Sequence, residues 1–396
     1  GEAISCFANS AIWLIVGAFL FSRGFIKTGL GKRIAYNLIA AFGSSSLRLS
    51  YALALSDLIL APATPSNTAR VGGVIMPITT SLAKAFGSEP QDGPRKIGSF
   101  LMQSIYQVNT ITSAMFQTSM AGNTLVAALA LQSFGIGITW GDWAMSAIVP
   151  GIIALIIMPY FIYKAYPPEI KDAREAQQMI REELKGLGKM SFQEWVMLGV
   201  FILALVLWAT SQLTHLDATT VAFLGISILL ATGVLIWDDV KSEKGAWDTL
   251  VWMGTLMGFA GFLSKLGFIK WATVLVGGYI PEGSWIIAFV IAVLINTYSH
   301  YVFASLTAHI SAMFVAFSAI AISAGAPPML TLLMIAFTSN LCMSLTHYAA
   351  GPSPVIFNTG YVPQNTWWKL GFFSSVINLI IFVGLGSIWM KAIGMW

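Results

Sequence analysis

Two polar stretches inside otherwise apolar sequence decide the fold: APATPSNTARVGGVIMPI at 61–78 and HYVFASLTAHISAMF at 300–314. Each lies between two short apolar runs. Short apolar runs broken by Pro, Asn and Ser are typical of re-entrant segments rather than of full membrane crossings. Polar backbone at membrane depth is tolerated only where it lines a cavity. The pattern therefore predicts two re-entrant helical hairpins, at about 47–86 and about 283–325, whose tips line an internal site.

The composition requires lipid as the solvent. Of the 396 residues, 57% are hydrophobic and only 10% are charged, and the mean hydropathy is +0.76. A soluble protein carries about 25% charged residues. The net charge of +4 is spread over the loops and predicts no nucleic-acid partner. With only Cys6 and Cys342, we expect neither a disulfide framework nor a Cys-based metal site. The sequence begins at Gly1 without a cleavable signal, so we expect that the true N-terminus is missing or processed.

Apolar runs of roughly 20 residues predict an all-α integral membrane protein. Spanning helices are expected at 8–40, 140–164, 193–212, 218–237, 247–277 and 367–393. Two more helices, at about 98–131 and about 330–363, are expected to be interrupted at 117–123 (QTSMAGN) and 346–354 (THYAAGPSP). The charged stretch 166–192 predicts an interfacial linker between a first half, 1–165, and a second half, 193–396.

Three landmarks recur in the same order in the two halves. GFIKTGL at 24–30 matches GFLSKLG at 261–267, Ser66 matches Ser305, and Ala121-Gly122 matches Ala350-Gly351, at offsets of 237, 239 and 229 residues (261 − 24, 305 − 66 and 350 − 121). Paired interrupted segments in corresponding positions indicate the substrate site of a transporter. An odd number of crossings between equivalent points would invert the second copy.

The two tips have the chemistry of an anion site. A helix begins directly after Ser66 and another after Ser305, and a helix N-terminus presents unpaired N–H groups and a positive dipole end. Two such tips that face each other would bind a ligand with two negative groups. The hydroxyls of Ser66, Thr68, Ser305 and Thr307 and the amide of Asn67 add donors. The alternative is helix capping alone, without a ligand.

Two ionisable residues occupy matching positions, because Arg70 and His309 each lie four residues after a tip serine. A cation in the first helical turn opposes the helix dipole and is costly in a membrane, which indicates a functional role. The alternative is a snorkelling Arg and a hydrogen-bonded core His. Asp57 is the expected buried partner of Arg70. For His300 and His347, packing is the favoured interpretation.

Enzyme motifs are missing from the sequence. It contains no HExxH, no phosphate-binding loop with its Lys, and no GxSxG, so no catalytic residue and no cofactor is expected. The predicted spans hold too few carboxylates for a proton-pumping relay.

Longer blocks carry a resemblance to a known family. They are WLIVGAFLFSRGFIKTGLGKRIA, APATPSNTARVGGVIMPI, YPPEIKDAREA, WDDVKSEKGAWDTLVW, HYVFASLTAHISAMF and SLTHYAAGPSPVIFNTGYV. Over nearly its whole length the chain resembles the divalent anion/sodium symporter superfamily. Within it, the chain is most similar to the exchanger branch, which comprises plastid 2-oxoglutarate/malate translocators and bacterial citrate/succinate or tartrate/succinate antiporters.

The resemblance implies a particular architecture. It implies two inverted repeats, an elevator-type transport domain that moves against a scaffold, and a homodimer. The membrane would be a bacterial inner membrane or a plastid inner envelope. Family members have about three further N-terminal helices, so we expect the chain to be truncated before its first crossing.

The resemblance also assigns residues to the site. The family signature SNT corresponds to Ser66-Asn67-Thr68. The second signature departs from it as Ser305-Leu306-Thr307, because Leu306 stands where symporters have Asn, and this argues against a sodium site there. Loop residues of the interrupted helices complete the predicted substrate site, with His347 as a further candidate and no metal ligand: Ser119, Gly122, Asn123, Ala350 and Gly351.

The family contains exchangers and symporters, and fixed charge favours the exchanger. Arg70 and a protonated His309 would replace two mobile sodium ions electrically. A bound dicarboxylate would then leave the site near neutral, and the empty site would keep up to two positive charges. Carrying uncompensated charge through a low dielectric costs several kcal/mol per ion. The sequence thus predicts sodium-independent exchange of dicarboxylates, with a sodium-coupled dicarboxylate or tricarboxylate symporter as the alternative.

Overall fold

The computed structural model describes residue 4 and residues 7–267 and 285–396, and these are almost entirely helical. The described residues form no strand; Ser45 and Asp172 make one isolated bridge. Seven helical stretches within the described part are long and apolar enough to cross a membrane. They are Ser10–Thr28, Trp140–Ala165, Phe192–Ala209, Trp285–Val302, Leu306–Ser323, Pro328–Leu345 and Gln364–Ala392.

The first half contains eight α-helices, two short 3-10 turns (η2 and η4) and one π-helical turn (η3) among the described residues. Their bounds are α1 Ser10–Thr28, α2 Leu30–Phe42, α3 Ser46–Leu60, η2 Ala61–Ala63, α4 Asn67–Arg70, η3 Val71–Ile75, α5 Met76–Ala85, α6 Gly98–Met115, η4 Gln117–Ser119, α7 Ala121–Phe134 and α8 Trp140–Ala165.

The linker carries the amphipathic helix α9, Arg174–Gly186. It packs its apolar face on α2 and leaves its charged face exposed. The described elements of the second half follow it. They are α10 Phe192–Ala209, α11 Ser211–Thr214, α12 Ala218–Ala231, α13 Trp237–Ser242, α14 Lys244–Lys265, α16 Trp285–Ser299, η5 His300–Val302, α17 Leu306–Ser323, α18 Pro328–Leu341, η6 Cys342–Leu345, α19 Pro352–Phe357, α20 Gln364–Leu379, η7 Ile380–Gly386 and α21 Ser387–Ala392.

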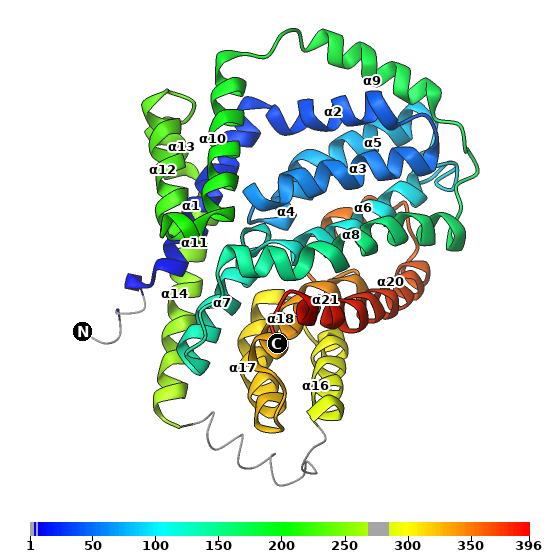
Figure 1. The fold of residues 1–396 in the computed structure, drawn as a ribbon. Coiled ribbons are helices and arrows are strands. Elements are labelled where there is room, and N and C mark those ends of the chain that lie inside the picture. The colour runs from blue at the N-terminus through cyan, green and yellow to red at the C-terminus, as the bar shows by residue number, and fades with distance from the viewer. Residues whose placement is uncertain (1–3, 5–6, 268–284) are drawn as a thin grey trace.

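Several predicted spans differ from the helices. The run 8–40 forms two helices of different direction, because Gly29 adopts a left-handed φ of 73° and ends α1 (Figure 1). Glycine takes that conformation without the steric cost of a Cβ. Helix α12 ends at Ala231, well before the predicted 237, because Gly233 also has a left-handed φ. Helix α14 ends at Lys265, and 268–277 of the predicted 247–277 lie outside the described residues.

At both expected hairpins the described residues form two helical arms that meet at a tip, with 283–284 of the second lying outside the described residues. In the first, α3 and η2 lead to a tip at 64–66, and a continuous helical segment runs from Asn67 to Ala85. In the second, α16 and η5 lead to a tip at 303–305, followed by α17. Both expected interruptions also occur: α6 breaks before α7, and α18 breaks before α19. Re-entry stays a prediction for both hairpins, and the arms of the second are long enough to cross a membrane.

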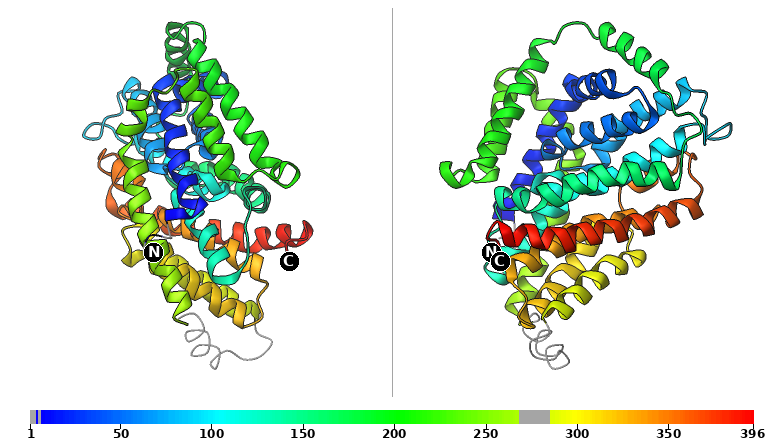
Figure 2. Two further views of the ribbon diagram at one scale, coloured as in Figure 1. Left: turned by 90° about the vertical axis from the view of Figure 1, so that its left-hand side faces the viewer. Right: turned by 45° about the vertical axis from the view of Figure 1, so that its right-hand side comes forward.

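The helices fall into two groups (Figures 1 and 2). Helices α1, α10, α12 and α14 pack together on one side. The other group holds both hairpins and both interrupted helices, together with α8, α20 and α21. Helix α7 lies between the groups, because it contacts α1 and α14 on one side and α17 on the other. This arrangement brings the hairpin tips and the helix breaks together.

Candidate functional site: two helix tips and two broken helices

Both tip serines cap the helices that follow them. The Oγ of Ser66 accepts a hydrogen bond from the backbone N–H of Ala69 at 3.1 Å, and the Oγ of Ser305 accepts one from Ala308 at 3.3 Å. Asn, Ser and Thr are preferred at this position for that reason. The capping role is therefore present at both tips, and each Ser hydroxyl keeps its own hydrogen as a donor.

The guanidinium of Arg70 fills a cage of oxygen atoms beside the first tip. It is fully buried, with an exposed fraction of 1%. All three of its nitrogen atoms donate to protein oxygens, and these come from the first hairpin, from α6 and from the turn η4 between α6 and α7. The acceptors are Asp57 Oδ1 (2.9 Å), Thr64 O (2.9 Å), Ser119 O (2.9 Å), Ser113 Oγ (3.1 Å) and Thr112 Oγ1 (3.3 Å).

Asp57 is the partner of Arg70, as the sequence predicted, and it is equally buried. Its carboxylate also accepts hydrogen bonds from the Asn109 amide, at 3.2 and 3.4 Å, and from the Thr112 hydroxyl. Hydrogen bonds of this number are what a buried ion pair needs to offset its desolvation. The charges of the pair cancel, so the fixed positive charge is smaller than the count of cations in the sequence suggests.

The second tip has a related but different cluster. The offset of 239 residues that separates the tip serines also separates Arg70 from His309 (309 − 70 = 239). By that offset Asn296 stands in the place of Asp57. Its amide donates to Ser339 Oγ at 3.1 Å and to Thr338 Oγ1 at 3.4 Å. An amide thus replaces the carboxylate, and a histidine replaces the arginine.

His309 is buried and has one side-chain partner among the described residues. Its Nε2 lies 3.1 Å from the hydroxyl of Ser299, and that hydroxyl donates to Asn296 O at 3.0 Å. Because the serine hydrogen is committed to Asn296, Nε2 of His309 is the donor in the other contact. The described contacts of His309 include no carboxylate.

Each loop between broken helices contacts both hairpins. A Cβ on Gly351 would lie 2.1 Å from the Thr68 hydroxyl, so this loop fits directly against the first tip. The same loop reaches the second hairpin, where Ala349 O accepts from Nε2 of His300 at 2.8 Å. The loop between α6 and α7 leads directly into a contact with the second hairpin, because a Cβ on Gly122 at the start of α7 would lie 2.7 Å from a methyl group of Ile310 on α17. The two tips and two breaks therefore form one region.

Some predicted site residues use their polar groups in hydrogen bonds within the protein. The Asn123 amide donates to Ser113 O and Phe116 O at 2.8 and 2.9 Å, and its oxygen accepts from Asn340 at 2.7 Å. The Ser119 hydroxyl donates within the α6–α7 loop, and its carbonyl accepts from Arg70. These residues hold the loop in shape.

The tip residues Asn67, Thr68, Leu306 and Thr307 are placed differently. Asn67 and Leu306 are buried, whereas Thr68 and Thr307 are only partly buried. The Asn67 oxygen accepts from the Thr68 N–H at 3.0 Å, and its amide nitrogen has only a weak contact with a Met sulfur at 3.5 Å. The threonine hydroxyls, like those of the tip serines, are thus available as donors for a ligand at the tips.

His347 lies in an aromatic cluster. Its Nδ1 accepts from Nε1 of Trp368 at 3.0 Å, and the ring packs on Phe357, Tyr348 and Trp368. These contacts are those of a packing residue, as the sequence favoured.

A cavity of about 300 Å³ opens beside the second tip. It lies between α14 and the start of α7, and its polar lining includes Ser305, Thr307 and Asp248. A space of this size is within the range of small-ligand sites.

Sequence reasoning missed the side chains that surround Arg70 and His309. They are Asn109, Thr112, Ser113, Asn296, Ser299, Thr338 and Ser339. A signal was present, because polar residues cluster in otherwise apolar helices just before each break.

Comparison with known proteins gives the family. The family model described as the sodium:sulfate symporter transmembrane region matches residues 1–396. The chain belongs to this family. It is 51% identical over 396 residues to YflS of Bacillus subtilis, which is named as a malate transporter, and it covers 83% of that protein. It is 46% identical over 399 residues to chloroplastic dicarboxylate transporter 1 of Spinacia oleracea and covers 70% of it.

A bacterial relative and a solved structure agree with this assignment. The chain is 41% identical to the inner membrane protein YbhI of Escherichia coli, with 99% of the chain and 82% of that protein covered. The crystal structure of the YdaH transporter of Alcanivorax borkumensis matches the whole chain with a TM-score of 0.61, 11% identity and 88% coverage of that structure. This family member is a multi-pass integral membrane protein with the fold of a transporter.

Proposed function

We propose that the protein exchanges dicarboxylates across the membrane without sodium. The relatives named above as malate and dicarboxylate transporters support the substrate class. The 2-oxoglutarate, malate and succinate class fits two positive helix ends, because each end would receive one carboxylate. The runner-up is sodium-coupled symport, which the name of the family favours.

The observation that carries sodium independence is the cage around Arg70. Sodium, like other hard cations, is bound by several oxygen atoms from carbonyls, hydroxyls and carboxylates. Such oxygens surround the first tip, and a tethered guanidinium already occupies them. At the second tip, Leu306 offers no polar ligand and the buried His309 fills the matching position.

We further propose that the anion binds between the tips. Backbone N–H groups that the caps leave free in the first turn after each tip would donate hydrogen bonds to the carboxylates, and the hydroxyls of Thr68 and Thr307 and the amide of Asn67 would add donors. Gly351 and Gly122 permit the close approach of the loops, and Ser66, Ser305, Ser119, Asn123 and Ala350 shape the site.

The two groups of helices support an elevator mechanism, which we propose. The group that holds the hairpins, with α7 at its edge, would move against α1, α10, α12 and α14. The two halves would be inverted repeats, and the functional unit a homodimer. Cross-linking and mass measurement in lipid nanodiscs test the dimer, and a monomer would contradict it.

Counterflow in proteoliposomes tests the proposed function. Uptake of labelled malate should require 2-oxoglutarate, malate or succinate inside the vesicles and should be equal in sodium, potassium or choline chloride. A symporter would require a sodium gradient and no internal substrate. A sodium requirement in this assay would refute sodium-independent exchange.

A further inference from the structure

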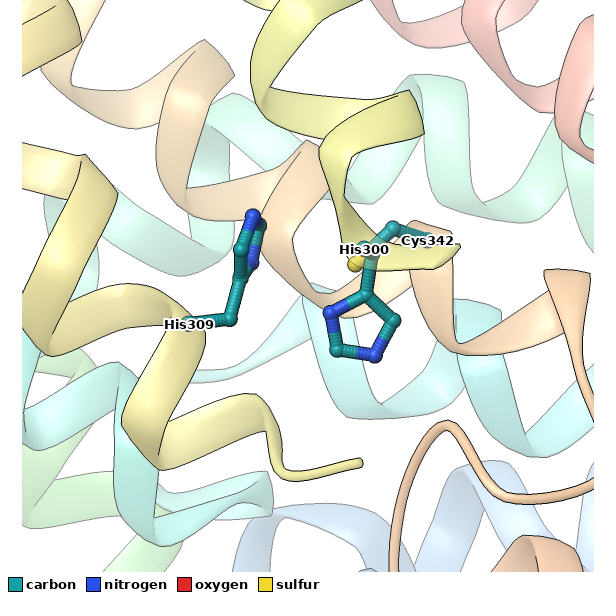
Figure 3. Close-up of side chains that lie close together, drawn as sticks. All are labelled: His300, His309 and Cys342. Atoms are coloured by element: carbon teal, nitrogen blue, oxygen red, sulfur yellow. The ribbon is translucent and has the colours of Figure 1, made fainter. Parts of the chain in front are cut away.

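A histidine pair and a thiol meet in the interior beside the second tip. His300 on η5, His309 on α17 and Cys342 on η6 are all fully buried, and they come from three different elements (Figure 3). One potential ligand atom from each lies within 4.8 Å of the other two. The rings of His300 and His309 stand edge to face, with centroids 4.8 Å apart.

The free atoms in this cluster are electron-pair donors. His300 donates its Nε2–H to Ala349 O at 2.8 Å, and His309 donates its Nε2–H to Ser299 Oγ at 3.1 Å. In both rings Nδ1 is then the unprotonated nitrogen, and neither Nδ1 has a hydrogen-bond partner within the described residues. A buried polar atom is costly to leave without a partner, and a ligand that took the electron pairs of both nitrogens would remove that cost.

This hydrogen-bond pattern is that of metal-binding histidines. A histidine that binds a metal through one nitrogen almost always donates its other N–H to a carbonyl, carboxylate or similar group, which fixes the tautomer and the ring. Both histidines here have that second partner. The thiol of Cys342 supplies a third ligand, and at present it donates to Ser339 O at 3.3 Å.

We propose that His300, His309 and Cys342 form a binding site for a divalent transition metal of the zinc type, with Nδ1, Nδ1 and Sγ as ligands. Zinc binds imidazole and thiolate in tetrahedral sites, at about 2.0–2.1 Å to nitrogen and about 2.3 Å to sulfur. Those bond lengths put the ligand atoms of a tetrahedral site closer together than 4.8 Å, so the cluster has to contract when the metal binds. A water or an anion oxygen would complete the fourth position.

The charge balance gives the site a consequence for the second tip. The metal takes an electron pair from each ligand, and the thiol proton leaves to water, because the thiolate is the ligand form. A dication, one thiolate and two neutral imidazoles sum to one positive charge. Metal binding would thus place a cation in the position that corresponds to Arg70. This site goes beyond dicarboxylate exchange and does not depend on it.

Cobalt serves as the probe, because Co²⁺ adopts the same tetrahedral coordination as Zn²⁺ and shows a thiolate-to-metal absorption band. Purified, chelator-treated protein in detergent is titrated with Co²⁺ and then with Zn²⁺. We expect one Co²⁺ per chain, a thiolate band that Zn²⁺ abolishes, and a rise in melting temperature with zinc. Cys342→Ser should lose the band, and His300→Gln should weaken binding by at least about tenfold.

Matched controls replace a cysteine and a histidine that are not proposed ligands. Cys6→Ser and His215→Asn should keep the band and the affinity of the parent. The zinc-induced rise in melting temperature is measured on the parent protein, so it tests the site even if a ligand variant fails to fold. Absence of a thiolate band and of a zinc-induced shift in the parent would refute the site, and so would binding that survives in Cys342→Ser. None of these readouts involves transport, so they remain separate from the exchange assay.

Discussion

Replacing Arg70 by alanine should turn a sodium-insensitive protein into a sodium-sensitive one. The substitution removes all the nitrogen donors of the cage and leaves Asp57 as a buried, unpaired carboxylate. Loss of one partner from a buried ion pair costs about 3–5 kcal/mol. The oxygens that bound the guanidinium then line a hole with the chemistry of a sodium site.

The stability that sodium should restore to Arg70→Ala follows from the linkage between ligand binding and folding. A ligand that binds only the folded state at about 100 times its Kd stabilises it by about 2.7 kcal/mol. High sodium should therefore restore more than half of the stability that Arg70→Ala loses. The assay is the unfolding midpoint of the purified variant in sodium chloride and in choline chloride of equal ionic strength. The parent should show no difference between the two salts.

The control for this experiment is the double variant Arg70→Ala/Asp57→Asn. It removes the unpaired carboxylate, so it should be more stable than Arg70→Ala in choline, and it should gain little from sodium because the charged ligand is gone. The reasoning is refuted if Arg70→Ala does not respond to sodium, or if the double variant responds equally.

Three further predictions concern the tips, the loop before α19, and an ion pair between α1 and α13. Thr68→Val and Thr307→Val should each weaken dicarboxylate binding by roughly 10- to 100-fold, since each removes a hydrogen bond to an anion, which contributes about 1.5–3 kcal/mol; calorimetric titration that finds parental affinity in both would contradict the site. Gly351→Ala should abolish exchange in a folded protein, because its Cβ would overlap the Thr68 hydroxyl, and uptake at the parental rate would contradict that packing. Burial acts to raise the pKa of Asp239, but hydrogen bonds from Lys27 and from a backbone N–H outweigh it and lower that pKa. Asp239→Asn should therefore cost about 1 kcal/mol at neutral pH and progressively less as the pH falls through the lowered pKa, whereas a cost that persists at low pH would exclude the carboxylate as its source.

The sequence predicted the features that depend on local chemistry. Ser66 and Ser305 cap their helices through a hydrogen bond that spans three residues, and Pro and Gly ended helices close to where they stand in the sequence. The partner of Arg70 was also predictable, because Asp57 is the one carboxylate in the preceding arm.

Features that depend on packing between distant segments were not predictable. Thr112 and Ser113 became part of the cage because α6 lies beside the first hairpin; the polar cluster before the break marks them in the sequence, but no local pattern reveals Arg70 as their partner. Cys342 looked like an isolated thiol in the sequence and is brought beside His300 only by the break after α18. Asn123 and Ser119 both donate to Ser113 O on α6, which the sequence did not reveal, and their roles in ligand binding stay predictions.

The ion pair changes the physical account of why exchange would be obligatory. Arg70 and Asp57 sum to zero, so the charge that holds back the empty carrier must come mainly from the two helix ends, each about half a positive charge. When the dianion leaves, those ends lose their counter-charge in a poorly solvated site, and movement of the empty carrier becomes costly. Arg70→Ala in the absence of sodium adds one negative charge and nearly cancels both ends, so it should leak substrate into substrate-free buffer. The double variant Arg70→Ala/Asp57→Asn leaves the net charge as in the parent, so its ratio of exchange to net efflux should stay high. Equal leakage from both variants would mean that the geometry of the cage, and not its charge, couples the two directions of transport.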